Sequence, residues 1–199
     1  MITTLGEYEM QLVTDSNILI TKNSIIRKVY EMFGGLSEDY KKLLQEVDLI
    51  LPTEIGPKIS RGENYNGLPY VILDYPRQFG KADVFAIRSF FWWGNFFSIT
   101  VQLAGEYQQK WAVPLETAIG AGAFEGWSIG SAIDPWQHHF DADNYTPIHQ
   151  HKTYGLSDLP FIKLAKKIPL NKWDEAEIFF SENFSFLINT LSASGANSM

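Results

Sequence analysis

The sequence predicts an α+β fold, with an antiparallel β-sheet packed against N-terminal and C-terminal helices. One sign is the segment 84–104, where two β-branched and aromatic runs flank Gly94-Asn95, a pair typical of two-residue hairpin turns. The other sign is that apolar residues recur at helical spacing near residues 25–47 and 171–191. Helices grouped around a hairpin favour α+β, whereas doubly wound folds alternate strands with helices.

The size and composition of the chain suit a single domain. It has 199 residues, of which 45% are hydrophobic and 20% are charged, so a sizeable core is available. We expect the domain to span residues 1–191, followed by a disordered tail over residues 192–199.

Charge and residue usage exclude several classes of partner and site. The formal net charge of −7 opposes nucleic-acid binding. Because the chain has no cysteine, disulfides and thiolate sites are excluded. We predict a cytoplasmic protein without a membrane span, because no segment has the pattern of a signal peptide or a transmembrane helix.

Two short helices are expected near the N-terminus. Thr21 or Asn23 is placed to cap the first helix, whose apolar stripe continues to Phe33. Gly34-Gly35 favours the left-handed conformation in which helices end, so we predict that the first helix stops there. Ser37 would then cap a second helix that runs antiparallel to the first.

The remaining elements follow from local signals. They are a polar loop at 58–67, a strand at 68–75 that ends at Pro76, short helices at 106–112 and 114–119, a helix at 157–168 and a last helix at 171–191. The apolar spacing at 157–168 also alternates in the manner of a strand, so both interpretations stay open there.

The hairpin register places one charge on the predicted core. Centring the turn on Gly94-Asn95 pairs Trp92 with Phe97 and puts Arg88 on the otherwise apolar face. A buried guanidinium needs a carboxylate or a ligand anion, and Asp74 and Asp83 are close in sequence. A register shifted by one residue is the alternative explanation.

The opposite face of the hairpin is a candidate binding surface. Trp93, Phe91 and Phe96 lie there among serine and threonine residues, so they are predicted to line a small-molecule cleft. Arg88, on the other face, is a separate candidate for binding a ligand anion. The alternative is that these aromatic side chains are buried against a partner subunit.

A second candidate site is a histidine-rich window. It contains His138, His139, His149, His151, Asp134, Asp141 and Asp143. Imidazole nitrogens and carboxylate oxygens suit Zn, Ni or Fe(II) when no thiolate is available. If residues 148–151 are extended, His149 and His151 point to one side as a chelating pair, joined by one of the two adjacent histidines and by Asp141 or Asp143. The alternative is a polar surface loop without a metal.

One further motif suggests a serine hydrolase. Gly126-Trp-Ser128-Ile-Gly130 fits the G-x-S-x-G pattern, in which Ser128 would be the nucleophile. The pattern requires a strand before the serine and a helix after it, whereas Pro135 leaves room for about one helical turn. This interpretation therefore ranks below the other two.

The order of helices, the segment PKISRGENYNGLPYVILDYPR and an aromatic antiparallel hairpin resembles that of small bacterial proteins of the YktB-like kind. The resemblance covers about half of the chain and rests on this layout. It implies an α+β domain and supplies no catalytic residues, and the histidine window lies outside it.

These observations lead to one expected function and one alternative. The leading expectation is a cytoplasmic protein that binds a small molecule, with a divalent metal held by the histidine window. If the protein is an enzyme, metal-assisted hydrolysis is the favoured reaction class. The alternative is an interaction or structural module that forms a homo-oligomer and holds no metal.

Overall fold

The computed structural model describes residues 3–47, 49, 51–150 and 155–193. Its α-helices are α1 Glu7–Thr14, α2 Ser16–Gln45, α3 Glu106–Gly120 and α4 Ala176–Ser192. Its strands are β1 Lys58–Tyr65, β2 Leu68–Phe79, β3 Val84–Trp92, β4 Phe96–Ala104, β5 Ser128–Gly130, β6 Tyr145–Pro147 and β7 Ile162–Pro169. Short 3-10 turns are η1 Ile148–Gln150, η2 Leu156–Asp158 and η3 Leu170–Glu175.

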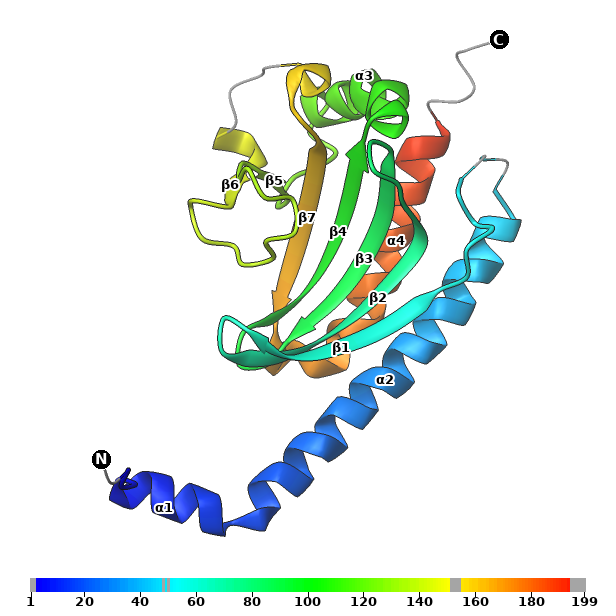
Figure 1. The fold of residues 1–199 in the computed structure, drawn as a ribbon. Helices are drawn as coiled ribbons and strands as arrows, with labels where there is room; N and C mark the ends of the chain where they lie inside the picture. Colours follow the sequence, from blue (N-terminus) through cyan, green and yellow to red (C-terminus); the bar gives the residue numbers. More distant parts are fainter. Residues whose placement is uncertain (1–2, 48, 50, 151–154, 194–199) are drawn as a thin grey trace.

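The strands form one antiparallel sheet in the order β1-β2-β3-β4-β7-β5-β6 (Figure 1). The first four strands follow one another as a meander, and β7 returns beside β4 after α3 and the short strands β5 and β6. Helices at both ends of the chain pack with this sheet, so the predicted α+β class is confirmed. None of the helices within the described residues combines the length and apolar character needed to cross a bilayer.

The predicted register of the β3–β4 hairpin is wrong by one residue. Trp92 pairs with Phe96, and the turn therefore contains three residues, Trp93, Gly94 and Asn95. Gly94 has a φ of +71°, a left-handed conformation that glycine adopts at little cost. Because side chains alternate along a strand, the shift moves every β3 side chain to the other face relative to β4.

The two faces of the sheet differ in cover and in chemistry. One face packs with α2, α3 and α4 in the main core, which includes Phe33, Phe91, Phe97, Trp111 and Phe180. The second face carries a smaller apolar cluster of Ile72, Phe90, Trp92 and Phe96. The same face carries Asp74, Arg88 and Lys163, so it joins an apolar part to a charged part.

The pair Gly34-Gly35 does not end a helix. It lies inside the single helix α2, which continues to Gln45. The buried residues Phe33, Leu36 and Tyr40 keep a helical spacing across the pair, so packing on the sheet outweighs the cost of about 1 kcal/mol per glycine.

Four other predicted elements need correction. Residues 58–65 form the edge strand β1 instead of a loop, and β2 continues past Pro76 to Phe79. The strand interpretation of residues 162–168 is the correct one, because β7 pairs with β4 along its length. The two helices expected at 106–119 are one helix, α3. Within the tail, residues 194–199 lie outside the described residues.

Candidate functional site

Residues 131–144, called the covering segment below, lie against the second face of the sheet (Figure 1). The Tyr65 hydroxyl accepts hydrogen bonds from the backbone N–H groups of His138, at 2.6 Å, and His139, at 3.0 Å. The N–H of Ser131 donates to the carbonyl of Asn144 at 2.8 Å, which brings the two ends of the segment together. The segment is therefore a closed loop held at its middle by β1.

Arg88 and Asp74 form an ion pair beneath this segment. Arg88 Nε lies 2.7 Å from one carboxylate oxygen of Asp74, and Nη2 lies 3.0 Å from the other, so the pair is bidentate. Both side chains are largely buried. The carboxylate predicted for Arg88 is therefore Asp74, and the two residues come from neighbouring strands.

The second partner of Arg88 is His138. Arg88 Nη1 lies 3.0 Å from His138 Nε2. A guanidinium only donates hydrogen bonds, so this nitrogen of the histidine accepts and carries no proton. Burial, followed by the charge of Arg88, holds the pKa of His138 well below its usual value. His138 is therefore neutral, and its Nε2 atom already accepts a hydrogen bond from Arg88.

Lys163 is a buried lysine on the same face. Its side chain donates to the carbonyl of Gln137 and lies 4.8 Å from the centre of the Tyr145 ring. Only 1% of the residue is exposed. Burial first, and then the positive charge of Arg88, lowers the pKa of Lys163 to about 7.

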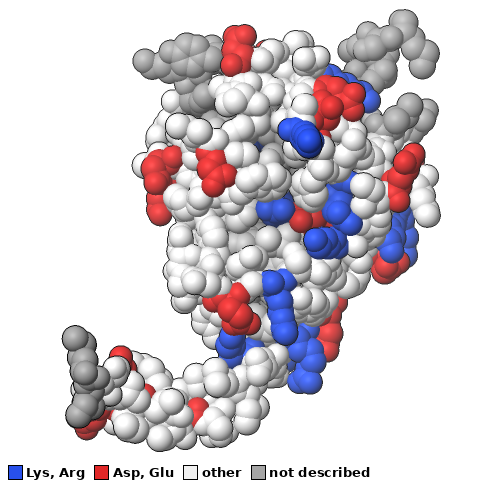
Figure 2. All heavy atoms as spheres, in the orientation of Figure 1, with Lys and Arg blue, Asp and Glu red and all other residues white. Residues whose placement is uncertain are grey.

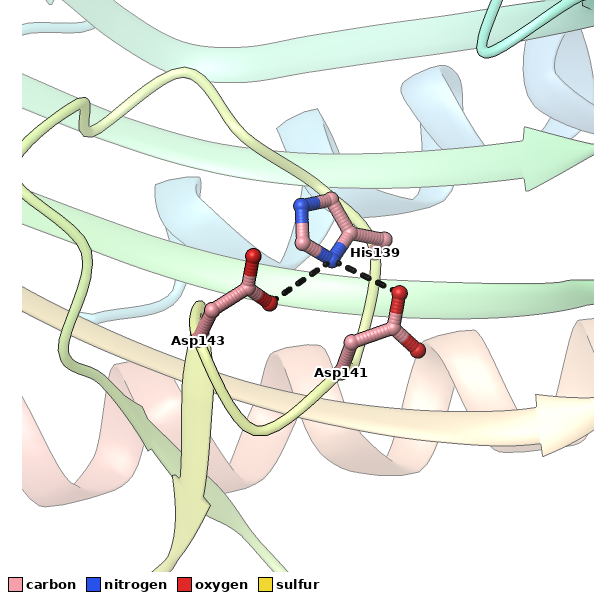
Figure 3. Close-up of side chains that lie close together, drawn as sticks. All are labelled: His139, Asp141 and Asp143. Atoms are coloured by element: carbon pink, nitrogen blue, oxygen red, sulfur yellow. Dashed lines mark ion pairs between the residues drawn. The ribbon is translucent and has the colours of Figure 1, made fainter.

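A group of three possible metal ligands lies at the rim of the covering segment (Figure 3). His139 Nδ1 is 3.2 Å from an oxygen of Asp141 and 3.7 Å from an oxygen of Asp143. Nδ1 is buried and makes no hydrogen bond within the described residues. Both carboxylates are exposed, so they are free to rotate.

The histidines predicted to act together have separate positions. His138 points to Arg88, whereas the adjacent His139 points to Asp141 and Asp143. His149 lies on η1, a 3-10 turn, so the extended conformation that was to align it with His151 is absent. His149 is exposed and faces Gln150. His151 lies outside the described residues.

The residues predicted to line an aromatic cleft lie on two different faces. Phe91 is in the main core, and Trp93 packs against the same core. Phe96 lies on the second face, where its ring meets Phe140 of the covering segment. Arg88 shares that face, but it is held by Asp74 and His138. The shift of the hairpin register explains why Phe96 does not share a face with Phe91 and Trp93.

Ser128 lies at the start of strand β5 and pairs with Pro147 and Ala165. In the described part of the chain, no helix directly follows this strand. The turn between a strand and a helix that a nucleophile elbow requires is therefore absent.

Sequence reasoning missed the residues that organise the site. If residues 162–168 form a strand, Lys163 and Ala165 point to the same face, so the strand interpretation could have predicted which face Lys163 occupies. No local signal identifies Gln137 and Tyr145 as its partners, because 26 and 18 residues of chain separate them from it (163 − 137 and 163 − 145). Tyr65 lies in a region that was expected to be a loop.

Comparison of the chain with known protein families, with curated proteins and with solved structures finds no match. The resemblance to YktB-like proteins stays a prediction.

Proposed function

We propose that the protein binds a divalent transition-metal cation through His139, Asp141 and Asp143, and that the cation serves the binding of a small molecule at the covering segment. The observation that carries this proposal is the buried Nδ1 of His139, which makes no hydrogen bond among the described residues and faces two carboxylates. A neutral imidazole with two carboxylates suits Zn, Ni or Fe(II).

The spacing of these atoms supports the proposal. One ligand atom from each residue lies within 4.8 Å of the other two. Two ligands of one zinc ion are at most about 4.2 Å apart, twice a bond length of roughly 2.1 Å. The gap closes by rotation of Asp141 and Asp143, whose side chains are exposed, while His139 stays fixed by its backbone bond to Tyr65.

The coordination chemistry defines what the cation does in this proposal. Three protein ligands leave a position for water or for an oxygen of a small molecule. With His139 bonded to both carboxylates through the cation, residues 139–143 of the covering segment gain a local cross-link. The bound cation thereby fixes the conformation of this part of the segment, next to which the small molecule would bind.

The test is a titration of untagged, chelator-treated protein with Zn²⁺, followed by calorimetry. We expect about one equivalent to bind, and Asp141→Asn and Asp143→Asn each to weaken binding by at least about tenfold, because each removes a charged ligand. Both substitutions keep the side-chain shape at exposed positions, so loss of folding does not complicate the result.

The matched control is His149→Ala, which removes an exposed histidine outside the group. Its affinity for zinc should equal that of the unaltered protein. Absence of binding to the unaltered protein, or equal loss of affinity in the control, would overturn the proposal.

A further inference from the structure

The N-terminal helices form an arm that leaves the body of the protein (Figure 1). The arm comprises residues 3–21, all of which are exposed. Helix α1 has no buried residue, and the first buried residue of α2 is Ile26. The chain bends at Asp15, which ends α1 and caps α2.

The surface of this arm is unusually apolar. Eight large side chains are 40% to 69% exposed, namely Leu5, Tyr8, Met10, Leu12, Val13, Ile18, Leu19 and Ile20. An eight-residue helix with no buried side chain is marginal in water, because most helical stability comes from packing of an apolar face. The arm therefore requires a surface that a single chain does not supply.

The charges on the arm indicate which kind of partner surface it binds. Glu7, Glu9 and Asp15 are its only charged residues, which gives the arm a charge of −3. Helices that lie on membranes carry lysine and arginine on their polar face, since the lipid surface is negative. An acidic apolar arm fits a basic protein surface instead.

Such a surface lies at the root of the arm. A groove there is lined by Asn23, Ile26, Arg27, Tyr30 and Arg61, so it combines apolar side chains with two arginine side chains. Arg27 and Arg61 are exposed, and neither forms an ion pair within the described residues. Figure 2 shows Asp and Glu along the arm and Lys and Arg where it joins the body.

We propose that two copies of this chain pair through their arms, antiparallel, with α1 of each copy on the Arg27–Arg61 groove of the other. Glu9 lies nine residues before Ile18 and Arg27 nine residues after it, so antiparallel pairing about a two-fold axis near Ile18 brings the acidic α1 of one copy toward the basic groove of the other. The same axis brings Ile18, Leu19 and Ile20 of both copies together at the centre. The acidic α1 of each copy contacts the Arg27–Arg61 groove of the other, so two copies satisfy both contacts.

The first test measures the mass of the full-length protein by light scattering after size exclusion, over a range of micromolar concentrations. We expect a dimer, and we expect Leu19→Glu with Ile20→Glu to convert it to a monomer, because the symmetry buries four charges at the centre. Ile133→Glu is the matched control, since Ile133 is 98% exposed and lies outside the arm. It should leave the dimer unchanged.

The second test exchanges the charges of Arg27 and Glu9 to check that these two residues pair between the copies. Arg27→Glu should weaken the dimer by about tenfold or more, since symmetry places each substitution in the interface twice. Glu9→Arg in the same chain should restore the affinity, because both ion pairs then form with reversed charges.

Three results would overturn the proposal. One is a monomer for the unaltered protein. Another is a variant with both Arg27→Glu and Glu9→Arg whose dimer affinity is no higher than that of Arg27→Glu alone. The third is a monomer that sediments with vesicles of phosphatidylcholine and phosphatidylserine, which would assign the arm to a membrane. The test uses none of the metal-binding residues, so its outcome is independent of the zinc titration.

Discussion

At the scale of single residues, the second face of the sheet buries charged side chains, which are more stable in water than in the protein interior unless they are paired. Arg88 is offset by the Asp74 carboxylate, and His138 stays neutral beside it. Among the described residues, the close partners of the Lys163 amine are the carbonyl of Gln137 and the ring of Tyr145. Its low pKa is the physical result of burying an amine without a carboxylate.

The protonation of Lys163 predicts how stability depends on pH. In the unfolded chain the amine keeps a pKa near 10.5, whereas in the folded protein it falls to about 7. Between these values the unfolded state binds more protons, so the free energy of unfolding rises as the pH increases from 7 to 9, by on the order of 2 kcal/mol. This gain is absent below pH 7.

Urea unfolding at pH 7 and pH 9 measures this effect. In Lys163→Met the rise between the two pH values should disappear, because the substituted side chain does not titrate. Lys172→Met is the control, as Lys172 is half exposed. A rise that persists in Lys163→Met would show that another group causes it.

At the scale of elements, packing on the sheet overrides several local signals. Gly34-Gly35 is a strong signal for the end of a helix, but α2 continues through it because the buried stripe resumes at Leu36. The polar sequence of β1 pairs as an edge strand, where one set of backbone groups is bonded to β2. Long-range pairing thus decides elements that local composition assigns otherwise.

The continuity of α2 predicts a stabilising substitution. Gly35 is exposed, and a Cβ atom added there has no neighbouring atom within 4 Å. Gly35→Ala should raise the free energy of unfolding by about 0.5–1 kcal/mol, because alanine loses less backbone entropy in a helix. Denaturant midpoints measure the change.

The contrasting substitution is Gly105→Ala. Gly105 has a φ of +60°, and a Cβ atom there would lie 2.1 Å from Asp83 Oδ1, so this variant should be destabilised. A Gly35→Ala variant less stable than the unaltered protein would contradict a continuous helix at this point.

At the scale of the whole molecule, the sheet separates the main core from the proposed metal site. The face toward α2, α3 and α4 holds the main core, whereas the second face holds the charged network, and the covering segment on that face carries the metal-ligand group. The arm lies outside both. Substitutions in the main core should therefore affect folding more than the proposed binding.

Phe180 of α4 tests this division. Its ring is fully buried and meets the rings of Phe33 on α2 and Phe97 on β4, at 5.5 and 5.9 Å between centres. Phe180→Ala should lower the free energy of unfolding by about 3–5 kcal/mol through lost burial and an unfilled cavity. Ile178→Ala, at an exposed position of the same helix, should change it by at most about 0.5 kcal/mol.

Thermal or urea unfolding of the two α4 variants measures the difference. Zinc binding by folded Phe180→Ala should equal that of the unaltered protein, since the metal-ligand group lies beyond the sheet. A similar loss of stability in both variants would contradict the assignment of Phe180 to the main core.

The sequence alone determined the α+β class, the presence of the hairpin, the last helix apart from residues 171–175, which belong to the 3-10 turn η3, and the windows in which charged and imidazole side chains gather. These properties depend on composition and on periodicity over a few residues, which the chain carries locally. It also identified Asp74 and Asp83 as candidate partners for Arg88 from their closeness in sequence, and the pairing of β2 with β3 selects Asp74.

Only the tertiary structure decided which side chains share a face and which meet across the molecule. A turn of three residues in place of two moves Arg88 away from Val101 and separates Phe91 from Phe96. The backbone bonds from the covering segment to Tyr65 turn His138 inward and leave His139 with Asp141. Strand pairing and contacts between distant segments set these outcomes, and the spacing of residues along the chain does not contain them.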